Sequence, residues 1–302
     1  MKHLLRIAGL DRHELGYLLD RADRFKAHPL AAPGLLRGRT VLMYFARPSL
    51  RTRVAIETAV ARLGGVPLTV GPAELRLGRG ERLGDTARVI GSYAAVVVLR
   101  TFDDAEVVRF AQAAHVPVIN ALTDGHHPLQ ALADLMTLRE HVGDLRGRKL
   151  AYVGPATNVT HSLIEAAALT GMTVAVAAPD GHGPDPAVLA VAEELSGGGR
   201  TVVTPDPYEA VKEADAVCAG PWPAFSPQAA VFAPYRVTAD LLAAAGPRPV
   251  FLHHLPALRG AEAADEVVDG PASLVFPQAA NRLPVAQAVL ETLLTNRLAA
   301  AR

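Results

Sequence analysis

A serine, a threonine and two arginines stand together in the stretch Ser49-Leu50-Arg51-Thr52-Arg53. An apolar run at 41–45 precedes it and a helix-like run at 54–63 follows, so the stretch marks a strand-to-helix turn. The first turn of a helix offers unpaired N–H groups and the positive end of the helix dipole. With hydroxyl and guanidinium donors added, the turn suits a phosphate. The alternative is an ordinary serine N-cap beside solvated arginines.

Other polar residues follow predicted strands in the same way. Arg100 ends an apolar run at 95–99, where a lone arginine is more often a solvated strand end. His127 and Gln130 bracket Pro128 at an expected helix start, where proline is favoured and the histidine has a capping or packing alternative.

The elements that position these residues alternate along the chain. Strands are predicted at 41–45, 67–70, 95–99, 116–119, 150–153, 173–177, 201–203, 215–219 and 249–252. Helices are predicted at 11–27, 53–63, 83–93, 104–114, 129–141, 159–170, 186–195, 207–213, 238–245 and about 284–300. This alternation predicts an α/β fold of two doubly wound parallel-sheet domains joined by helices.

A polar, turn-rich stretch at 143–149 marks the expected boundary, giving domains 1–143 and 144–283. In doubly wound sheets, ligands bind at the carboxyl ends of the strands. The loops that follow the strands, which carry Arg51, Arg100 and His127, are therefore where the site is expected.

Composition limits the classes of function. The 302 residues carry a formal net charge of zero, which argues against a nucleic-acid or anionic-membrane partner. The single cysteine, Cys218, excludes an internal disulfide framework and a cysteine metal cluster. Arg6 and Asp11 interrupt the apolar residues of the N-terminus, and no uncharged run approaches the roughly 18 residues that span a bilayer. A cytoplasmic protein is expected.

The ordered set of motifs resembles the transcarbamoylase family, and within it the ornithine carbamoyltransferase branch. The matching stretches are Ser-Leu-Arg-Thr-Arg at 49–53, Leu-Gly-Arg-Gly-Glu at 77–81, His-Pro-Leu-Gln at 127–130, His-His-Leu-Pro-Ala-Leu-Arg-Gly at 253–260 and Asn-Arg at 281–282. The resemblance implies transfer of a carbamoyl group from carbamoyl phosphate to an amine acceptor, without metal or cofactor. It also implies that the C-terminal helix, 284–302, packs back on the first domain.

The resemblance assigns the donor site residue by residue. It implies that carbamoyl phosphate contacts Ser49, Leu50, Arg51, Thr52, Arg76, Arg100, His127, Gln130, Leu255 and Arg282. Ser49, Arg51 and Thr52 would hold the phosphate. Arg100 and His127, with Thr52 nearby, would donate to the carbonyl oxygen. Gln130 and the backbone carbonyl of Leu255 would accept from the carbamoyl NH₂ group, and Arg282 would close the site from the second domain.

Relatives of this branch are trimers in which a loop near residue 80 reaches the neighbouring active site. The resemblance therefore implies a homotrimer. Arg76 lies in that loop, where ornithine enzymes often have glutamine, and it would add positive charge at the phosphate. The alternative for Arg76 is a surface arginine.

The chain departs from the family on the acceptor side. Ornithine enzymes bind the amino acid through Asp-x-Trp-x-Ser-Met-Gly, and the matching residues here are Gly220, Trp222, Ala224 and Phe225, with only the tryptophan kept. The family's Asn-Asn pair is Thr157-Asn158, and the cysteine of its late motif is His254. An alkyl ammonium with a pKa of about 10.4 must lose a proton before it attacks a carbonyl, and the missing aspartate would have attracted and oriented that ammonium.

The departures predict an acceptor other than ornithine, such as 2,3-diaminopropionate or a biosynthetic intermediate. His254 would then act as general base, and the alternative is that it packs like the cysteine it replaces. Genuine ornithine carbamoyltransferase activity and a non-catalytic carbamoyl-phosphate-binding homologue both stay open. So do enzymes for acylated ornithines. A nicotinamide enzyme is disfavoured because residues 154–159 lack the glycines that a pyrophosphate needs, and an aspartate-type enzyme because 74–84 contain no lysine.

Overall fold

The structure, a computed structural model, describes residues 1–75, 77, 80–195, 198–222 and 229–300. The chain forms two compact units: unit 1 comprises Met1–Leu132 and the segment from Asn281 onward, and unit 2 comprises Ala133–Ala280. Both boundaries lie inside helices, α5 (Pro128–Val142) and α12 (Val275–Ala300). The polar turn at 143–149 follows α5. Turn residues show where a helix ends, but they do not show in which unit the side chains of that helix pack.

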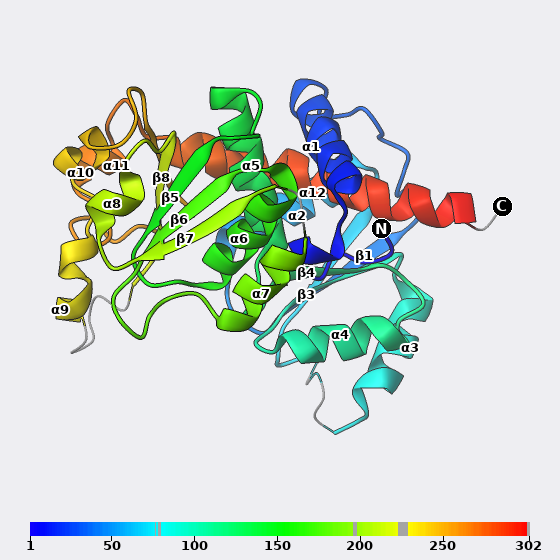
Figure 1. The fold of residues 1–302 in the computed structure, drawn as a ribbon. Coiled ribbons are helices and arrows are strands. Elements are labelled where there is room, and N and C mark those ends of the chain that lie inside the picture. The colour runs from blue at the N-terminus through cyan, green and yellow to red at the C-terminus, as the bar shows by residue number, and fades with distance from the viewer. Residues whose placement is uncertain (76, 78–79, 196–197, 223–228, 301–302) are drawn as a thin grey trace. The chain divides into compact units, whose positions relative to one another are not determined.

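Unit 1 contains a parallel four-stranded sheet with the order β2-β1-β3-β4 among its described residues. In chain order its elements are η1 (Ile7–Gly9), α1 (Arg12–Ala27), β1 (Thr40–Phe45), α2 (Leu50–Arg62), β2 (Val66–Val70), α3 (Leu83–Tyr93), β3 (Val96–Arg100), α4 (Asp104–Ala113) and β4 (Val118–Leu122). Figure 1 shows α3 and α4 side by side. Val97, Leu99 and Phe110 are fully buried in the core that these helices share with the sheet.

Unit 2 contains a parallel five-stranded sheet with the order β7-β6-β5-β8-β9 among its described residues. Its elements are β5 (Lys149–Val153), α6 (Asn158–Thr170), β6 (Thr173–Ala177), α7 (Pro186–Glu194), β7 (Arg200–Thr204), α8 (Pro207–Val211), β8 (Ala216–Ala219), α9 (Ala229–Phe232), η2 (Ala233–Tyr235), α10 (Ala239–Ala243), β9 (Val250–His253) and α11 (Asp265–Val268). The predicted α/β class with two parallel sheets is confirmed. The sequence did not predict α9 and α11, which are only one turn long.

Local sequence signals explain where the first helix begins. The Asp11 carboxylate accepts a hydrogen bond from the Glu14 N–H at 2.7 Å, and the Glu14 carboxylate accepts one from the Asp11 N–H at 3.2 Å. This reciprocal capping box satisfies two N–H groups that a helix start leaves unpaired. The buried residues of α1 include Leu15, Leu18 and Leu19, as the apolar periodicity predicts.

The predicted start of the last helix at 284 was wrong. Helix α12 begins at Val275 and contains Pro284 in its interior. Proline has no N–H, so Pro284 leaves the Ala280 carbonyl without its usual helical partner. Proline is commoner in the first turn of a helix than in its interior. None of the helices in the described parts of the chain is long and apolar enough to cross a membrane.

Candidate functional site

The predicted donor residues of unit 1 meet at the carboxyl edge of its sheet. Strand β1 pairs with β2 on one side and β3 on the other, so the connections that follow β1 and β3 diverge from a topological switch point. Phe45 is level with Arg100 in the β1–β3 register, and the Ala46 N–H donates to the Arg100 carbonyl at 2.8 Å. This geometry brings the loop of Ser49 next to Arg100.

Ser49 is the N-cap residue of α2, but its side chain makes no capping hydrogen bond. The ordinary N-cap alternative requires the Ser49 hydroxyl to cap the first turn of the helix, and in the structure it does not. Leu50 is 76% exposed, so any role it has at a ligand falls to its backbone. Arg51 and Thr52 lie in the first turn, where the free N–H groups and the helix dipole favour an anion.

Thr52 and Arg282 are joined directly. The Arg282 guanidinium donates a hydrogen bond to the Thr52 hydroxyl, and both side chains are buried. The next residue back, Asn281, accepts a hydrogen bond from Lys26 of α1 at 2.8 Å. The sequence analysis placed Arg282 in the second domain, whereas it lies in the part of α12 that packs in unit 1.

Three guanidinium groups converge near the α2 turn. Burial lowers the pKa of Arg51 below its ordinary value. Burial, and then the charges of Arg47 and Arg51, lower the pKa of Arg100 to about 10. The Nε atoms of Arg47, Arg51 and Arg100 are all buried without a hydrogen-bond partner among the described residues. Partly buried cations that repel one another and lack a full set of acceptors suit a multiply charged anion.

Sequence reasoning missed Arg47, which lies two residues before Ser49 in the same loop. Its guanidinium donates to the Asp124 carboxylate and lies 3.9 Å from the ring centroid of Phe102. These contacts fix Arg47 against the loops that follow β3 and β4. The sequence signal that could have identified Arg47 is its position close to the hydroxyl and guanidinium side chains of Ser49, Arg51 and Thr52.

His127 and Gln130 lie at the start of α5, and both are buried. The Gln130 N–H donates to the His127 carbonyl at 3.1 Å, which places both residues in one helical turn. Parallel pairing of β3 with β4 brings this connection to the same sheet edge as Arg100. The structure therefore collects every predicted donor residue of unit 1 that it describes at one edge.

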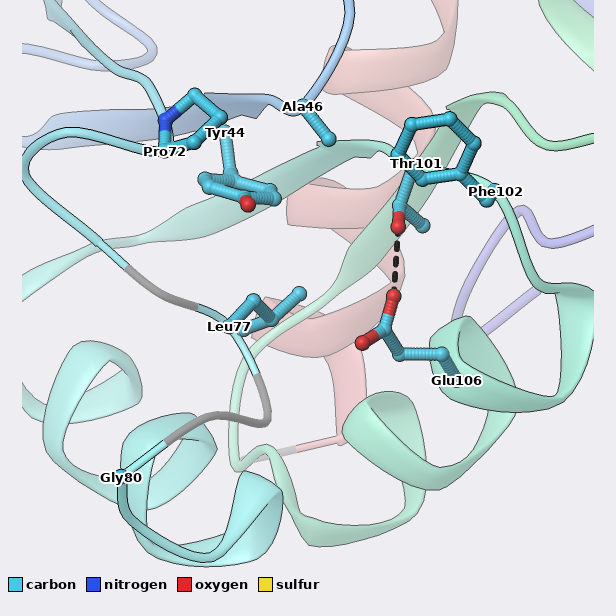
Figure 2. Close-up of a pocket in the computed structure, with 8 residues that line it drawn as sticks. All are labelled: Tyr44, Ala46, Pro72, Leu77, Gly80, Thr101, Phe102 and Glu106. Atoms are coloured by element: carbon cyan, nitrogen blue, oxygen red, sulfur yellow. Dashed lines mark hydrogen bonds between the residues drawn. The ribbon is translucent and has the colours of Figure 1, made fainter.

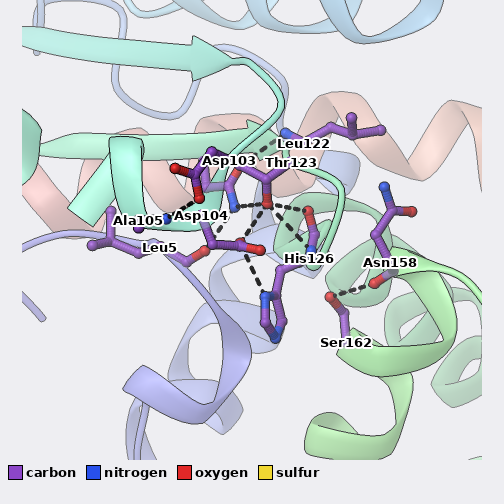
Figure 3. A network of polar contacts seen from close by, with 10 residues as sticks. Leu5, Asp103, Asp104, Ala105, Leu122, Thr123, His126, Asn158 and Ser162 are labelled. Atoms are coloured by element: carbon purple, nitrogen blue, oxygen red, sulfur yellow. Dashed lines mark hydrogen bonds and ion pairs between the residues drawn. The ribbon is translucent and has the colours of Figure 1, made fainter. Parts of the chain in front are cut away.

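The turn before His127 is held by Asp104, as Figure 3 shows. Asp104 Oδ1 accepts a hydrogen bond from the Thr123 hydroxyl at 2.5 Å and lies 3.0 Å from His126 Nδ1. Burial would raise the pKa of Asp104, but the hydrogen bonds from His126 and Thr123 outweigh it and hold that pKa below its ordinary value. A Cβ on Gly125 would come within 2.0 Å of this carboxylate, so the turn needs glycine at that position.

A cavity of about 450 Å³ lies in unit 1 (Figure 2). Its lining includes Ala46 and Thr101, the sequence neighbours of Arg47 and Arg100, together with Leu77 and Gly80. The Thr101 hydroxyl donates to Glu106 at 2.6 Å inside it. Arg76, predicted at the phosphate, falls outside the described residues.

The predicted acceptor residues of unit 2 also meet at one sheet edge. Strand β8 lies between β5 and β9, with Ala219 level with Val153 on one side and His253 on the other. Asn158 begins α6 after β5, Gly220 follows β8, and His254 follows β9. Ala224 and Phe225 fall outside the described residues.

Gly220 is enclosed by two aromatic side chains. A Cβ at this position would lie 2.3 Å from Tyr152 Oη and 2.8 Å from His254 Cε1. Tyr152 is fully buried, so it has little room to move, and burial raises the pKa of its hydroxyl above its ordinary value. His254 stacks on His253 with ring centroids 5.4 Å apart. The position has no space for a side chain in this arrangement.

Trp222 and Leu255 complete the described acceptor edge. Trp222 is 9% exposed and packs edge-on against Phe232, with ring centroids 5.7 Å apart. The Leu255 N–H donates to His253 Nδ1 at 3.0 Å.

Within the described residues, no group of three His, Cys, Asp or Glu side chains is placed to hold a metal ion.

Family models match both parts of the chain. One described as "Aspartate/ornithine carbamoyltransferase, carbamoyl-P binding domain" matches residues 2–140, and one described as "Aspartate/ornithine carbamoyltransferase, Asp/Orn binding domain" matches residues 146–293. The ornithine carbamoyltransferase of Acidothermus cellulolyticus is 44% identical, with 97% of each chain covered. That of Bacillus subtilis is 41% identical, with 97% of this chain and 94% of the relative covered.

Solved structures give the same result. The ornithine carbamoyltransferase from Pyrococcus furiosus superposes with a TM-score of 0.94 at 40% identity, covering 97% of both chains. The enzyme of the same name from Thermus thermophilus superposes with a TM-score of 0.90 at 40% identity, covering 97% of this chain and 99% of that one.

Proposed function

Because this chain belongs to the aspartate/ornithine carbamoyltransferase family, we propose that it transfers the carbamoyl group of carbamoyl phosphate to ornithine, giving citrulline and phosphate. The observation that carries the donor half is the convergence of Arg47, Arg51 and Arg100 at the start of α2. A phosphate dianion would neutralise these guanidinium groups and accept hydrogen bonds from them.

The proposed reaction needs no redox step. The neutral amine nitrogen of the acceptor attacks the carbonyl carbon, its proton passes to an oxygen of the phosphate group, and the bond from that carbon to the phosphate oxygen breaks. Phosphate leaves with the electron pair of that bond. Arg100 and His127 stabilise the negative charge that develops on the carbonyl oxygen, and the phosphate stays bound by Ser49, Arg51 and Thr52.

The remaining donor roles concern the carbamoyl NH₂ group and Arg282. Gln130 and the Leu255 carbonyl accept from the NH₂ group. Arg282 donates a hydrogen bond to the Thr52 hydroxyl. Its proposed role is to orient that hydroxyl toward the phosphate of carbamoyl phosphate. These assignments follow the family motifs and are supported by the burial of Gln130, Thr52 and Arg282.

Similarity supports ornithine as the acceptor over the other amines that the sequence predicted. Relatives about 40% identical over nearly the whole chain carry the name ornithine carbamoyltransferase. A different amine acceptor is the second candidate, favoured by the lack of space for a side chain at Gly220 beside Tyr152 and His254. In that candidate His254 accepts the proton of a less basic amine.

We also propose assembly as a homotrimer. Apolar side chains are exposed on α2 and on the edge strand β2, including Leu50, Val54, Val66 and Leu68. An edge strand with exposed apolar residues is normally covered by another element or chain. Light scattering during size-exclusion chromatography would give three times the mass of one chain, and a monomer at working concentration would contradict the trimer.

The function is tested by incubating the protein with carbamoyl phosphate and ornithine and measuring phosphate release together with the mass of the ureido product. We expect stoichiometric citrulline and phosphate. Tight carbamoyl phosphate binding without turnover on ornithine or on shorter diamino acids would instead indicate a non-catalytic relative. Turnover on a shorter diamino acid alone would support the second candidate.

A further inference from the structure

Glu262 is a buried carboxylate in the connection between β9 and α11. Its side chain is among the buried charged groups of unit 2, at 1% exposure. Oε1 accepts a hydrogen bond from the Trp222 N–H at 3.3 Å, and Oε2 accepts one from the Leu258 N–H at 2.6 Å. One carboxylate therefore binds the backbone of two loops, one following β8 and the other following β9.

Keeping this carboxylate in the interior has a cost. Burial raises the pKa of Glu262, and its backbone N–H partners only partly offset that rise. Among the residues that the structure describes, no cationic side chain pairs with Glu262, so only backbone hydrogen bonds offset the free-energy cost of its burial. Both partners are backbone groups, so what Glu262 fixes is the path of each loop.

The two loops carry the residues assigned to the acceptor edge. Gly220 and Trp222 lie in the first, and His254 and Leu255 lie in the second. The Gly220 position and His254 Cε1 are already in close apposition. A shift of either loop by a few tenths of an ångström would change the space between them.

We propose that Glu262 is a positioning residue that sets the spacing of the Trp222 and His254–Leu258 loops and thereby the affinity for the amine acceptor. The inference rests on the proposed carbamoyl transfer for its kinetic consequence. Its structural content, one carboxylate joining two loops, does not depend on the identity of the acceptor.

The test is E262Q, with E266Q as matched control, because Glu266 is an exposed glutamate in the adjacent helix α11. Glutamine keeps one acceptor oxygen but presents an NH₂ group to the second N–H, so one loop is released. We expect the KM for ornithine to rise about tenfold or more in E262Q. Affinity for inorganic phosphate, the probe of the unit 1 cluster, should change less than twofold, and E266Q should match wild type in both.

A second readout does not require turnover. Hydrogen exchange of the Trp222 and Leu258 amides should accelerate about tenfold or more at one or both positions in E262Q and stay unchanged in E266Q. A lower melting temperature with unchanged exchange at both amides and unchanged KM would overturn the inference. If wild type made no citrulline, the proposed function would fail, while the exchange experiment would still decide whether Glu262 holds the two loops.

Discussion

Arg282 of the last helix donates a hydrogen bond to Thr52 in the first turn of α2, across 230 positions of sequence. Both side chains are buried, and both belong to unit 1. The proposed phosphate turn is therefore held by the end of the chain as well as by its own helix. The contact joins Thr52 to an arginine that sequence analysis assigned to the second domain.

Replacing Arg282 by methionine should lower kcat/KM for carbamoyl phosphate about a hundredfold, because it removes a charged donor from Thr52 and from the ligand. The matched control is R21M, which breaks the ion pair between Arg21 and Glu291 that also ties α12 to unit 1. R21M should lower the melting temperature yet leave KM near wild type. Equal kinetic losses in both variants would mean that Arg282 acts only through helix packing.

Replacing Arg51 by methionine should stabilise the free protein while abolishing phosphate binding. Burial lowers the pKa of Arg51, so the folded state disfavours its charged form. The charge of Arg51 also lowers the pKa of Arg100, which shows that the two cations repel each other. A gain of about 1 kcal/mol would raise the melting temperature by roughly 2–4 °C. Inorganic phosphate should raise the melting temperature of wild type and leave R51M unchanged. A less stable R51M in phosphate-free buffer would contradict this account of the cluster.

Replacing Asp104 by asparagine should destabilise the protein at neutral pH and reduce kcat through the turn before His127. The folded pKa of Asp104 lies below its ordinary value of 3.8, so the ionised form is the stabilising one. Its contribution is therefore fully present above about pH 5 and disappears as pH falls through the folded pKa. The expected loss at pH 7 is about 1 kcal/mol, at the low end because the carboxylate is partly exposed.

The control for this change is D103N, since Asp103 caps α4 through the Ala105 N–H and asparagine caps equally well. Urea unfolding at a series of pH values measures both variants. The stability difference between D104N and wild type should shrink below pH 4. A difference that grew with acidity would show that Asp104 stabilises the turn in its protonated form.

Replacing Gly220 by alanine should cost about 1–3 kcal/mol because the new Cβ would overlap the Tyr152 hydroxyl. Y152F removes that oxygen, so the double variant G220A/Y152F should recover much of the loss. A double-mutant cycle measured by chemical denaturation gives the coupling between the two positions. Additive effects would mean that the two side chains do not compete for this space.

Much of the fold follows from the sequence. Apolar runs of three to five residues alternating with amphipathic segments predict the strands and helices, because parallel strands are buried on both faces. The start of α12 could not be predicted, since Pro284 lies inside a long helix whose residues are buried both before and after it. The units divide within α5 and α12, and no turn residue marks such a boundary.

The positions of the candidate site residues at the sheet edge were predictable where a motif follows a strand end, as for Ser49, Arg100 and His127. Arg47 was missed because its role depends on contacts with Asp124 and Phe102, which are distant in sequence. Glu262 was missed for a related reason: it binds backbone N–H groups, which no side-chain pattern reveals.

The most direct measurement of the central claim is kcat/KM for ornithine compared with that for 2,3-diaminopropionate, at saturating carbamoyl phosphate. Carbamoyl transfer to ornithine predicts the higher value for ornithine by at least about tenfold, because the longer acceptor uses more binding energy in the transition state. An equal or higher value for 2,3-diaminopropionate would contradict ornithine as the acceptor while leaving the donor site intact.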